Sequence, residues 1–589
     1  MLYHLPCLPG LIQLIFGKDP MKYTQILASL LIAAPGLQAH AEQPQIEKIQ
    51  TEETVQLETV KVSADFRQLD LQQLPSAITV VGADAIKNRN ADHLERVLSL
   101  APNVNFAASA SRARYFQIRG IGERSQFTDP INPSVGLIID GNDMTGLGGA
   151  ATLFDVEQIE ILRGPQGTAF GASALAGAIN IKSNQPTKET QGYVEAKAGN
   201  YNTQGLGGAV SGSLTENIQA RFAINKVKTD GYMKNLFLDS KDTNNIDETV
   251  ARGQLAWQIN ENNDLNILLF KTDINNGYDA FSLDNNRNTY SNMPGKDEQD
   301  TTAISALWNS KVNDAFELQV NGSTSKTESE YSYDEDWTYG NYDINTGECL
   351  DDCIRNADGT PTFGYTSFDE YLRDYEQDSI DVRLISGQEG RIFKDSTNWI
   401  VGIFSSSKEV ELTRNYTYDP QYKSDIKTNA TAVYTELSSQ LSLNNRLIYG
   451  LRIEDTSFDF SDNNGLSKNQ SETLWGGKIT FESMTSIDHL AYVSLARGFK
   501  AGSVNRNPII ADDKRLYDTE INHSLETGVK SSLLNDKLQT RIAIFFTQRE
   551  DQQVKQSFLY YKDSDPLELS PKFTDYFGNA GKGHNYGIE

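Results

Sequence analysis

The sequence predicts a transmembrane antiparallel β-barrel that follows a smaller α/β module. From Gln191 onward, segments of roughly 9–14 residues alternate apolar and polar side chains, which is the pattern of membrane-spanning strands. The connections between these segments are alternately short and long. The chain also has 26 Tyr and 25 Phe against 3 Cys and 6 His, and aromatic side chains favour extended strands.

The N-terminus has the pattern of an export signal. Lys22 follows the candidate start Met21, an apolar stretch covers residues 26–37, and residues 39–41 read Ala-His-Ala, a cleavage pattern. The apolar stretch is too short for a membrane-spanning helix. We therefore expect residues 1–41 to be a signal peptide with an upstream extension, removed by cleavage after its last alanine.

The two cysteines beyond this segment predict a disulfide. Cys349 and Cys353 lie in the sequence ECLDDC, inside an acidic, Tyr-rich stretch. An exported protein meets an oxidising compartment, where neighbouring cysteines pair. A zinc site would need further Cys or His residues nearby, and this stretch has none. No metal site is therefore expected.

A polar linker and a short strand-forming segment follow the signal. Residues 42–56 contain almost no large apolar residues and are expected to be solvated. Residues 57–64, LETVKVSA, have the composition of a strand. Such a segment either adds to the sheet edge of another protein or forms the first strand of the next domain, and the pattern leaves both open.

Residues 65–186 predict a small α/β module. Short apolar segments closed by glycine, such as VGLIIDG and GAINIKS, predict strands. The stretch NADHLERVLSLAPNV has helical spacing of its apolar residues, with Asn90 or Asp92 as the N-cap. The glycine-rich stretch 156–183 is not a phosphate-binding loop, because it has neither the Lys-Ser/Thr pair of a P-loop nor the glycine spacing of a dinucleotide fingerprint.

Residues 187–589 carry the alternating segments. In RLIYGLRIE, the side chains of Leu447, Tyr449, Leu451 and Ile453 are expected on one side of the strand. A soluble β-sandwich alternates in the same way, so alternation alone does not distinguish the two folds.

The lengths of the connections do distinguish them. Tight turns are expected at 214–217, 260–263, 311–314, 442–445, 484–487 and 533–536. Long acidic links rich in Tyr, Asn and Gly are expected near 229–247, 274–300, 327–376, 410–427, 501–517 and 553–574. Short turns at one rim and long loops at the other are typical of an outer-membrane barrel.

Composition excludes several classes of function. The net charge of −26 argues against a nucleic-acid partner. No stretch beyond the N-terminus is continuously apolar over about 18 residues, so helical membrane spans are not expected. Scattered histidines and the lack of a nucleophile–base spacing argue against an enzyme.

The sequence resembles the TonB-dependent receptors of Gram-negative outer membranes, of the iron–siderophore receptor type, over essentially the whole chain. LETVKVSA is similar to the family's TonB box, the stretch 156–183 to its plug signature, and SLARGFKAGSVN at 494–505 to a barrel strand and loop. The resemblance implies a barrel of about 22 strands, with residues 65–186 as a plug in the lumen. About 16 strands are expected in this sequence, and an open barrel would expose unpaired edges to lipid. We therefore expect the sequence to be truncated at its C-terminus by about six strands.

The resemblance also implies partners and a mechanism. TonB, with its inner-membrane energising complex, would bind the TonB box and pull, which remodels the plug. The expected ligand is a ferric siderophore, with cobalamin, haem or an oligosaccharide as alternatives; haem is disfavoured because the plug offers only His93 as an axial ligand. Outer-membrane lipid is a further partner, and no cofactor is expected because iron would travel with the ligand. A passive porin or a surface adhesin is a weaker alternative. The predicted TonB box consists of Glu58, Thr59, Val60, Lys61, Val62, Ser63 and Ala64.

Arginine and aromatic residues of the plug are the candidate ligand contacts, because guanidinium and aromatic groups suit an anionic, planar iron complex. The set is Arg112, Arg114, Tyr115, Phe116, Arg124, Gln126 and Phe127. The alternative is that these arginines tie the plug to the barrel or stay solvated. Arg119 and Arg163 precede glycines in plug strands and are expected to pair with carboxylates of the barrel wall, with Glu526 as one candidate.

Overall fold

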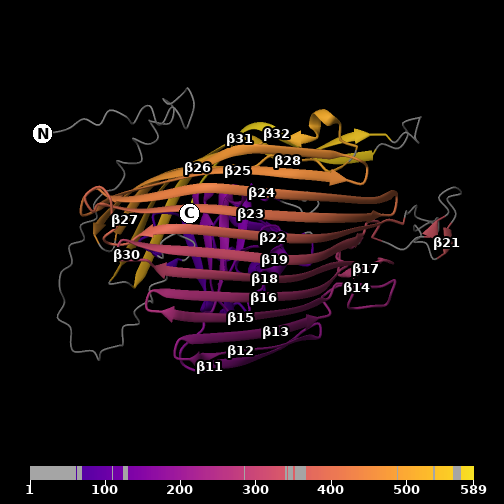
Figure 1. Ribbon diagram of the computed structural model, residues 1–589. Coiled ribbons are helices and arrows are strands. Elements are labelled where there is room, and N and C mark those ends of the chain that lie inside the picture. The colour runs from indigo at the N-terminus through magenta and orange to yellow at the C-terminus, as the bar shows by residue number, and fades with distance from the viewer. Residues whose placement is uncertain are drawn as a thin grey trace, which may run out of the picture. The chain divides into compact units, whose positions relative to one another are not determined.

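The computed structural model describes most of the chain from Lys61 to Glu589 (Figure 1). The described residues are 61–62, 69–108, 110–123, 130–283, 285–337, 341–342, 349–351, 366–486, 489–507, 509–534, 537–561 and 572–589. All contacts discussed below lie within one compact unit, formed by Val60–Ser531 and Thr540–Glu589. The predicted signal peptide and polar linker lie outside the described residues, as does Cys353, so the disulfide stays a prediction.

The plug is built on a mixed five-stranded sheet. Its strand order is β3-β9-β10-β7-β8, in which β10 runs parallel to β7 and antiparallel to β9. A second, three-stranded sheet of order β4-β5-β6 is formed by the part of the chain between β3 and β7. Alternate isoleucines of β9 and β10, among them Ile161 and Ile179, are fully buried in the plug core. The bounds are β3 Ile78–Gly82, β4 Val104–Ala107, β5 Tyr115–Ile118, β6 Ile121–Gly122, β7 Val135–Ile139, β8 Asn142–Asp143, β9 Val156–Arg163 and β10 Gly177–Ser183.

The helix predicted after Asn90 is replaced by two 3-10 turns. The apolar residues Leu94, Val97 and Leu98 are buried, as their spacing predicted. Neither predicted N-cap is used: His93, an extended residue without a side-chain capping bond, precedes the first turn. The amide of Leu94 donates to the carbonyl of Ala151 at 3.0 Å, which satisfies an amide that has no partner within the first turn of a helix. The helical elements of the plug are α3 Ala83–Asn88, η1 Leu94–Arg96, η2 Leu98–Leu100, η4 Gly148–Ala150, α4 Gly167–Phe170 and η5 Gly171–Ala174.

Within the described residues, the barrel wall is a single antiparallel sheet of 16 strands, which confirms the predicted fold and the number of strands expected in this sequence. Nearly all of its strands pair with the next long strand along the chain, and Figure 1 shows them side by side. The bounds are β11 Gln191–Gly199, β12 Thr203–Thr215, β13 Ile218–Thr229, β15 Ile246–Asn260, β16 Asn263–Tyr278, β18 Gly295–Lys311, β19 Phe316–Asp334, β22 Phe368–Ser386, β23 Thr397–Tyr416, β24 Asp419–Gln440, β25 Asn445–Asp462, β26 Ser467–Ser486, β27 His489–Lys500, β30 Glu520–Leu533, β31 Leu538–Tyr560 and β32 Lys572–Ile588.

One predicted long link is wrong. Residues 410–427 were expected to form a loop, but β23 continues to Tyr416 and β24 begins at Asp419. The charged and polar residues of this stretch pair as a hairpin, with a register shift between Arg414 and Tyr416, that extends beyond the length needed to cross a bilayer. The links after β13, β16, β19 and β27 are long and contain short strands. These are β14 Lys234–Asn235, β17 Asn288–Thr289, β20 Asn341–Tyr342, β21 Cys349–Asp351, β28 Ser503–Val504 and β29 Leu516–Tyr517.

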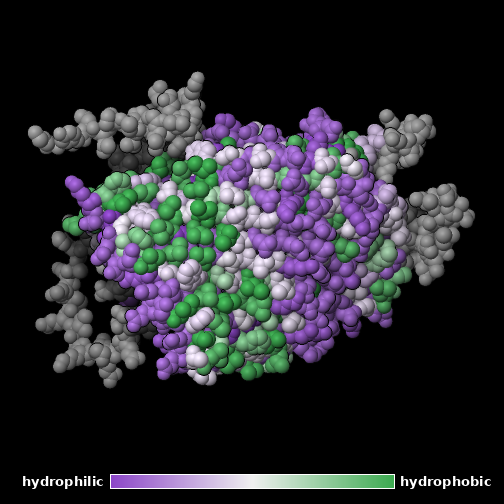
Figure 2. Space-filling model, viewed as in Figure 1, coloured by the Kyte–Doolittle hydropathy of each residue, from purple (hydrophilic) through white to green (hydrophobic). Residues whose placement is uncertain are grey.

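The outward face of the wall has an apolar zone and a charged zone. Figure 2 shows hydrophobic residues gathered toward the left of the view and hydrophilic residues toward the right, where Figure 1 places the long links that carry β14, β17 and β21. Strand pairing aligns six acidic residues of adjacent strands into one row across the sheet. The row consists of Asp273, Asp300, Glu328, Asp374, Glu411 and Asp425. Because charges facing lipid are costly, this row lies beyond the lipid-facing zone.

The plug packs against the inward face of the wall. Its core cluster includes Val250 of β15, Phe270 of β16 and Ala303 of β18, all of them buried. These inward positions alternate along each strand with exposed outward ones such as Leu269, which is 47% exposed. Among the described residues, no helix is both long enough and apolar enough to cross a lipid bilayer. The strands therefore place the plug next to the inner wall, where the functional side chains lie.

Candidate functional site

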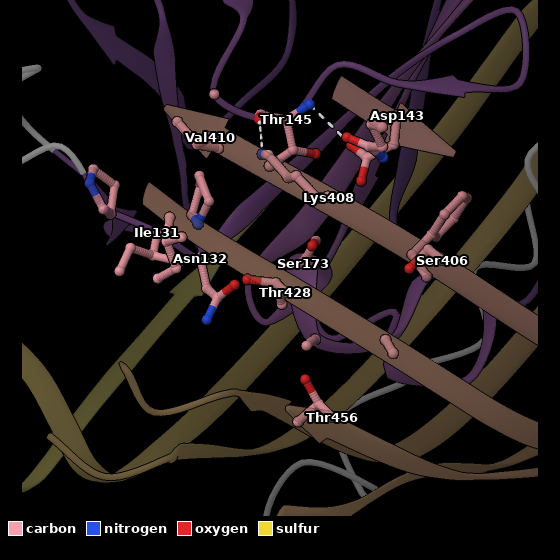
Figure 3. Close-up of a pocket in the computed structure, with 18 of the residues that line it drawn as sticks. Ile131, Asn132, Asp143, Thr145, Ser173, Ser406, Lys408, Val410, Thr428 and Thr456 are labelled. Atoms are coloured by element: carbon pink, nitrogen blue, oxygen red, sulfur yellow. Dashed lines mark hydrogen bonds between the residues drawn. The ribbon is translucent and has the colours of Figure 1, made fainter. Parts of the chain in front are cut away.

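A cavity lies between the plug and the inner wall, on the side of β22 to β25 (Figure 3). The plug contributes residues of three segments to it: 130–133; Asp143, Thr145 and Gly146; and Phe170, Ala172 and Ser173. The wall contributes alternate inward side chains of β23, including Ser406, Lys408 and Val410. Figure 3 shows side chains from the plug and from the strands converging on this space.

Cationic and aromatic groups share the lining of this cavity. Lys408 Nζ donates to the carbonyl oxygen of Thr145 at 3.3 Å and lies 5.8 Å from the centre of the Tyr375 ring. The Thr145 amide in turn donates to Asp143 Oδ1 at 2.9 Å, so the plug turn that receives the lysine is itself closed by a hydrogen bond. Tyr115, Phe170 and Phe404 add aromatic surface from both sides.

Glycine at position 171 allows the plug to approach the wall closely. Gly171 has a φ of +61°, and a Cβ there would lie 2.4 Å from Glu454 Oε2. Glu454 is paired with Arg452 through a 2.8 Å bond from Arg452 Nε, and both line the cavity. The glycine-rich plug segment noted in the sequence therefore serves close packing of backbone against charged wall residues.

Arg119 and Arg163 bind carboxylates of the wall. Arg119 Nη2 lies 2.6 Å from Glu526 Oε2 and 3.0 Å from Glu589 Oε2. Arg163 Nε lies 3.0 Å from Glu589 Oε2, so its partner is Glu589 and not the candidate Glu526. Glu526 also accepts bonds from the Ala77 amide at 2.9 Å and from the Tyr492 hydroxyl at 2.8 Å. The plug is thus joined to β30 and to Glu589, the residue after β32, by a buried network of charges.

Two of the arginines predicted to contact ligand bind the wall instead. Arg112 is buried and makes a bidentate pair with Glu248 of β15, at 2.6 and 2.9 Å. Arg114 pairs with Asp297 of β18 and lies 5.5 Å from the ring centre of Tyr331. Both arginines therefore tie the plug to the barrel, as the alternative interpretation predicted, and a ligand contact for either stays a prediction.

The other predicted contacts have different positions. Phe116 is 2% exposed and belongs to the plug core, so it does not face a ligand. Tyr115, its neighbour in β5, points the opposite way and lines the cavity. Arg124, Gln126 and Phe127 lie outside the described residues.

Sequence reasoning missed several residues of the interface. Arg221 of β13 makes a bidentate pair with Asp155 of the plug, with Nε 2.7 Å from Oδ2. Lys500 of β27 binds Glu123 of the plug at 2.7 Å. Lys408 was not singled out either. Each lies at an inward position of an alternating strand, and inward charges are ordinary in barrels, so the pattern held no signal that selected them.

Two residues of the predicted TonB box are described, and they pair within the chain. The strand β1 Lys61–Val62 is antiparallel to β2 Leu69–Asp70. Gln158 Nε2 donates to the carbonyl of Lys61 at 2.8 Å, and the Val62 side chain is fully buried. Its apolar neighbours are Leu71, Leu74, Ile78 and Leu162. The remaining residues of the box, 58–60 and 63–64, lie outside the described residues.

The fold and the interface define a plugged β-barrel, and comparison with known proteins identifies its family. The family model "TonB-dependent Receptor Plug Domain" matches residues 70–178, and "TonB dependent receptor-like, beta-barrel" matches residues 187–589. The chain belongs to the TonB-dependent receptors. These are receptors and transporters of the Gram-negative outer membrane and not enzymes.

Individual relatives are distant. The chain is 28% identical over 221 residues to the vitamin B12 transporter BtuB of Vibrio vulnificus, a match that covers 36% of this chain and 34% of that protein. It is 25% identical over 276 residues to the ferric enterobactin receptor PirA of Pseudomonas aeruginosa, which covers 40% of this chain and 36% of that protein. The chain thus matches about a third of the length of these curated relatives.

Solved structures share the fold. The ferric yersiniabactin uptake receptor FyuA from Yersinia pestis superposes with a TM-score of 0.70 at 17% identity, over 87% of this chain and 75% of that one. The alcaligin outer-membrane receptor FauA from Bordetella pertussis gives a TM-score of 0.64 at 15% identity, over 90% of this chain and 80% of that one.

Proposed function

We propose that this chain takes up a ferric siderophore across the outer membrane and that TonB supplies the work. The observation that carries the proposal is the cavity between plug and wall, which brings Lys408 and aromatic rings together in a protein of net charge −26. An anionic, largely planar metal complex suits such a mixture of cationic and aromatic groups. Relatives named as receptors for ferric enterobactin and ferric yersiniabactin support the same class of ligand.

The cavity has room for part of such a ligand. It encloses about 110 Å³, whereas sites for drug-sized ligands span roughly 300–1,000 Å³. The larger part of the ligand would therefore lie above the plug, among the long links between strands.

The need for work follows from the plug–barrel interface. Arg112, Arg119 and Arg163 are buried in ion pairs with carboxylates of the wall. Moving the plug breaks these pairs, and a charge that stays buried without its partner costs about 3–5 kcal/mol. The outer membrane has no ATP, so plug movement would need force from another membrane. TonB would apply it by adding a strand to the box.

Cobalamin is the second candidate, because the vitamin B12 transporter BtuB is among the relatives. A growth experiment separates the two. Cells whose only uptake route is this receptor would be starved of iron and given ferric enterobactin, ferric yersiniabactin or ferric alcaligin, and a cobalamin auxotroph would be given vitamin B12. Growth on at least one iron complex, lost without TonB, is expected. Growth on vitamin B12 alone would contradict the siderophore assignment.

Replacing Lys408 by methionine is expected to weaken ligand binding about 10- to 100-fold, since a charge-assisted hydrogen bond contributes roughly 1.5–3 kcal/mol. Lys427→Met is the matched control. Lys427 lies on the adjacent strand β24 but faces outward, with its ammonium 3.6 Å from Glu409. Equilibrium binding of the iron complex to cells that carry each variant measures the effect. Equal affinities of the two variants would remove Lys408 from the site.

A further inference from the structure

Two plug residues near the cavity, Glu123 and Ser134, are joined by hydrogen bonds to the Glu123 carboxylate. Glu123 follows β6, and Ser134 precedes β7. The Ser134 amide donates to Glu123 Oε2 at 3.0 Å, and the Ser134 hydroxyl donates to Oε1 at 2.8 Å. Both residues are buried, with exposures of 8% and 3%. Glu123 and Ser134, called the Glu123–Ser134 base below, are therefore held together independently of the barrel.

A lysine of the wall joins this base. Lys500, the last residue of β27, is 3% exposed. Its Nζ donates to Glu123 Oε1 at 2.7 Å and to the Ser134 hydroxyl at 3.2 Å. Burial alone would raise the pKa of the Glu123 carboxyl, but the charge and hydrogen bond of Lys500, with the bonds from Ser134, lower it below its ordinary value. The charged carboxylate is thus stabilised in place.

The residues just before this base line the cavity. Ile131 and Asn132 line the cavity together with Lys408 and Thr428, and Figure 3 shows Asn132 beside Thr428. Asn132 Nδ2 also donates to the carbonyl of Ala501 at 3.4 Å, directly beside Lys500. Lys500 at the end of β27 and the next residue, Ala501, therefore bind Ser134 and Asn132 of the plug, respectively.

We propose that Lys500 is a positioning residue for ligand capture: by binding the Glu123–Ser134 base, it holds the segment 130–134 against the cavity wall. Its effect on ligand binding rests on the proposed function, whereas its effect on the position of the segment does not. Lys500 does not reach the cavity itself, so it acts through Ile131 and Asn132.

The position of the segment can be measured without a ligand. Asn132→Cys would be labelled on intact cells with a membrane-impermeant maleimide, and the receptor without the engineered cysteine gives the background from Cys349 and Cys353. Lys500→Met should raise the labelling rate about tenfold, a loss of protection of roughly 1.4 kcal/mol. Lys500→Arg keeps the charge and should stay within about twofold of the unaltered receptor.

Two controls make the result specific. Lys408→Met removes a wall lysine that binds a different plug turn, through the carbonyl of Thr145, and should leave labelling at Asn132→Cys unchanged. Ser406→Cys, on the wall strand β23 and away from Ile131 and Asn132 in Figure 3, should be labelled at the same rate with or without Lys500→Met. If Lys500→Met does not reach the membrane, Glu123→Gln tests the same pair from the plug side.

The outcomes divide clearly. Equal labelling of Asn132→Cys with and without the substitution would overturn the proposal. A rise of the same size at Ser406→Cys would also overturn it, because it would mean general loosening of the plug. A binding assay with ferric enterobactin, ferric yersiniabactin and ferric alcaligin follows. Weaker binding in Lys500→Met and recovery in Lys500→Arg would extend the role to capture. If labelling rises as expected but no iron complex binds the unaltered receptor, the proposed ligand class fails and the positioning role stands.

Discussion

Replacing Val60 by proline is expected to abolish energised uptake and to leave surface binding of the ligand intact. Proline has no amide hydrogen, so it cannot complete the main-chain hydrogen bonds of a strand added to TonB. Val60 is a better target than Val62, because Val62 is buried against the plug and its replacement would also disturb plug packing. Uptake of radiolabelled iron complex at 37 °C, compared with binding on ice, separates the two steps.

Gln56→Pro is the matched control for this experiment. Gln56 lies in the polar stretch just before the box, where no strand pairing is predicted. Its replacement should leave uptake unchanged. Normal uptake by the Val60→Pro receptor would show that the segment LETVKVSA is not the TonB box, whereas loss of binding on ice would show that the substitution disturbs the receptor itself.

Replacing Arg119 by methionine is expected to destabilise the packing of the plug against the barrel wall by about 3–5 kcal/mol. The substitution leaves buried carboxylates without the cation that they share. Arg119 is the common partner of Glu526 and Glu589, both nearly buried. Without it these two side chains repel each other, and only Arg163 remains beside Glu589. The measurement is the permeability of cells to an antibiotic that is normally too large to cross, together with hydrogen exchange in β9 and β10.

Arg89→Met provides the comparison. Arg89 is an exposed plug arginine whose Nη1 donates to the Ser99 hydroxyl at 3.0 Å. Surface changes of this kind usually alter stability by less than about 0.5 kcal/mol, so permeability and exchange should stay at the level of the unaltered receptor. If Arg119→Met behaves like Arg89→Met, the network with Glu526 and Glu589 does not hold the plug.

The barrel was predictable because its signal is local. Each strand needs only alternate apolar and polar side chains and a turn at its end, and both can be read over a dozen residues. The prediction failed at 410–427, where charged residues suggested a loop. Those residues belong to β23 and β24, which extend beyond the lipid and can carry charges on their outward face. The polar residues of this stretch indicate where the strands leave the lipid, and the strands themselves continue beyond that point.

The plug core was predictable for a similar reason, and its helical stretch was not. Glycine-bounded apolar segments correspond to β7, β9 and β10. The spacing of Leu94, Val97 and Leu98 correctly predicted their burial. It did not predict two 3-10 turns in place of an α-helix, because a short run of apolar residues with this spacing is compatible with both. The spacing therefore predicted which side chains are buried, but not the backbone geometry.

By itself, the sequence determined the class of fold, the division into plug and barrel, and the presence of arginines that need carboxylate partners. Only the tertiary structure decided which carboxylate each arginine meets. Arg112 and Arg114 carry the same charge as a ligand-binding arginine would, and nothing near them in sequence separates the two roles. Their partners Glu248 and Asp297 are more than a hundred residues away in sequence. The register of the barrel strands brings these carboxylates next to the two arginines. Electrostatic energy depends on distance in space, and that distance is set by the pairing of the whole sheet.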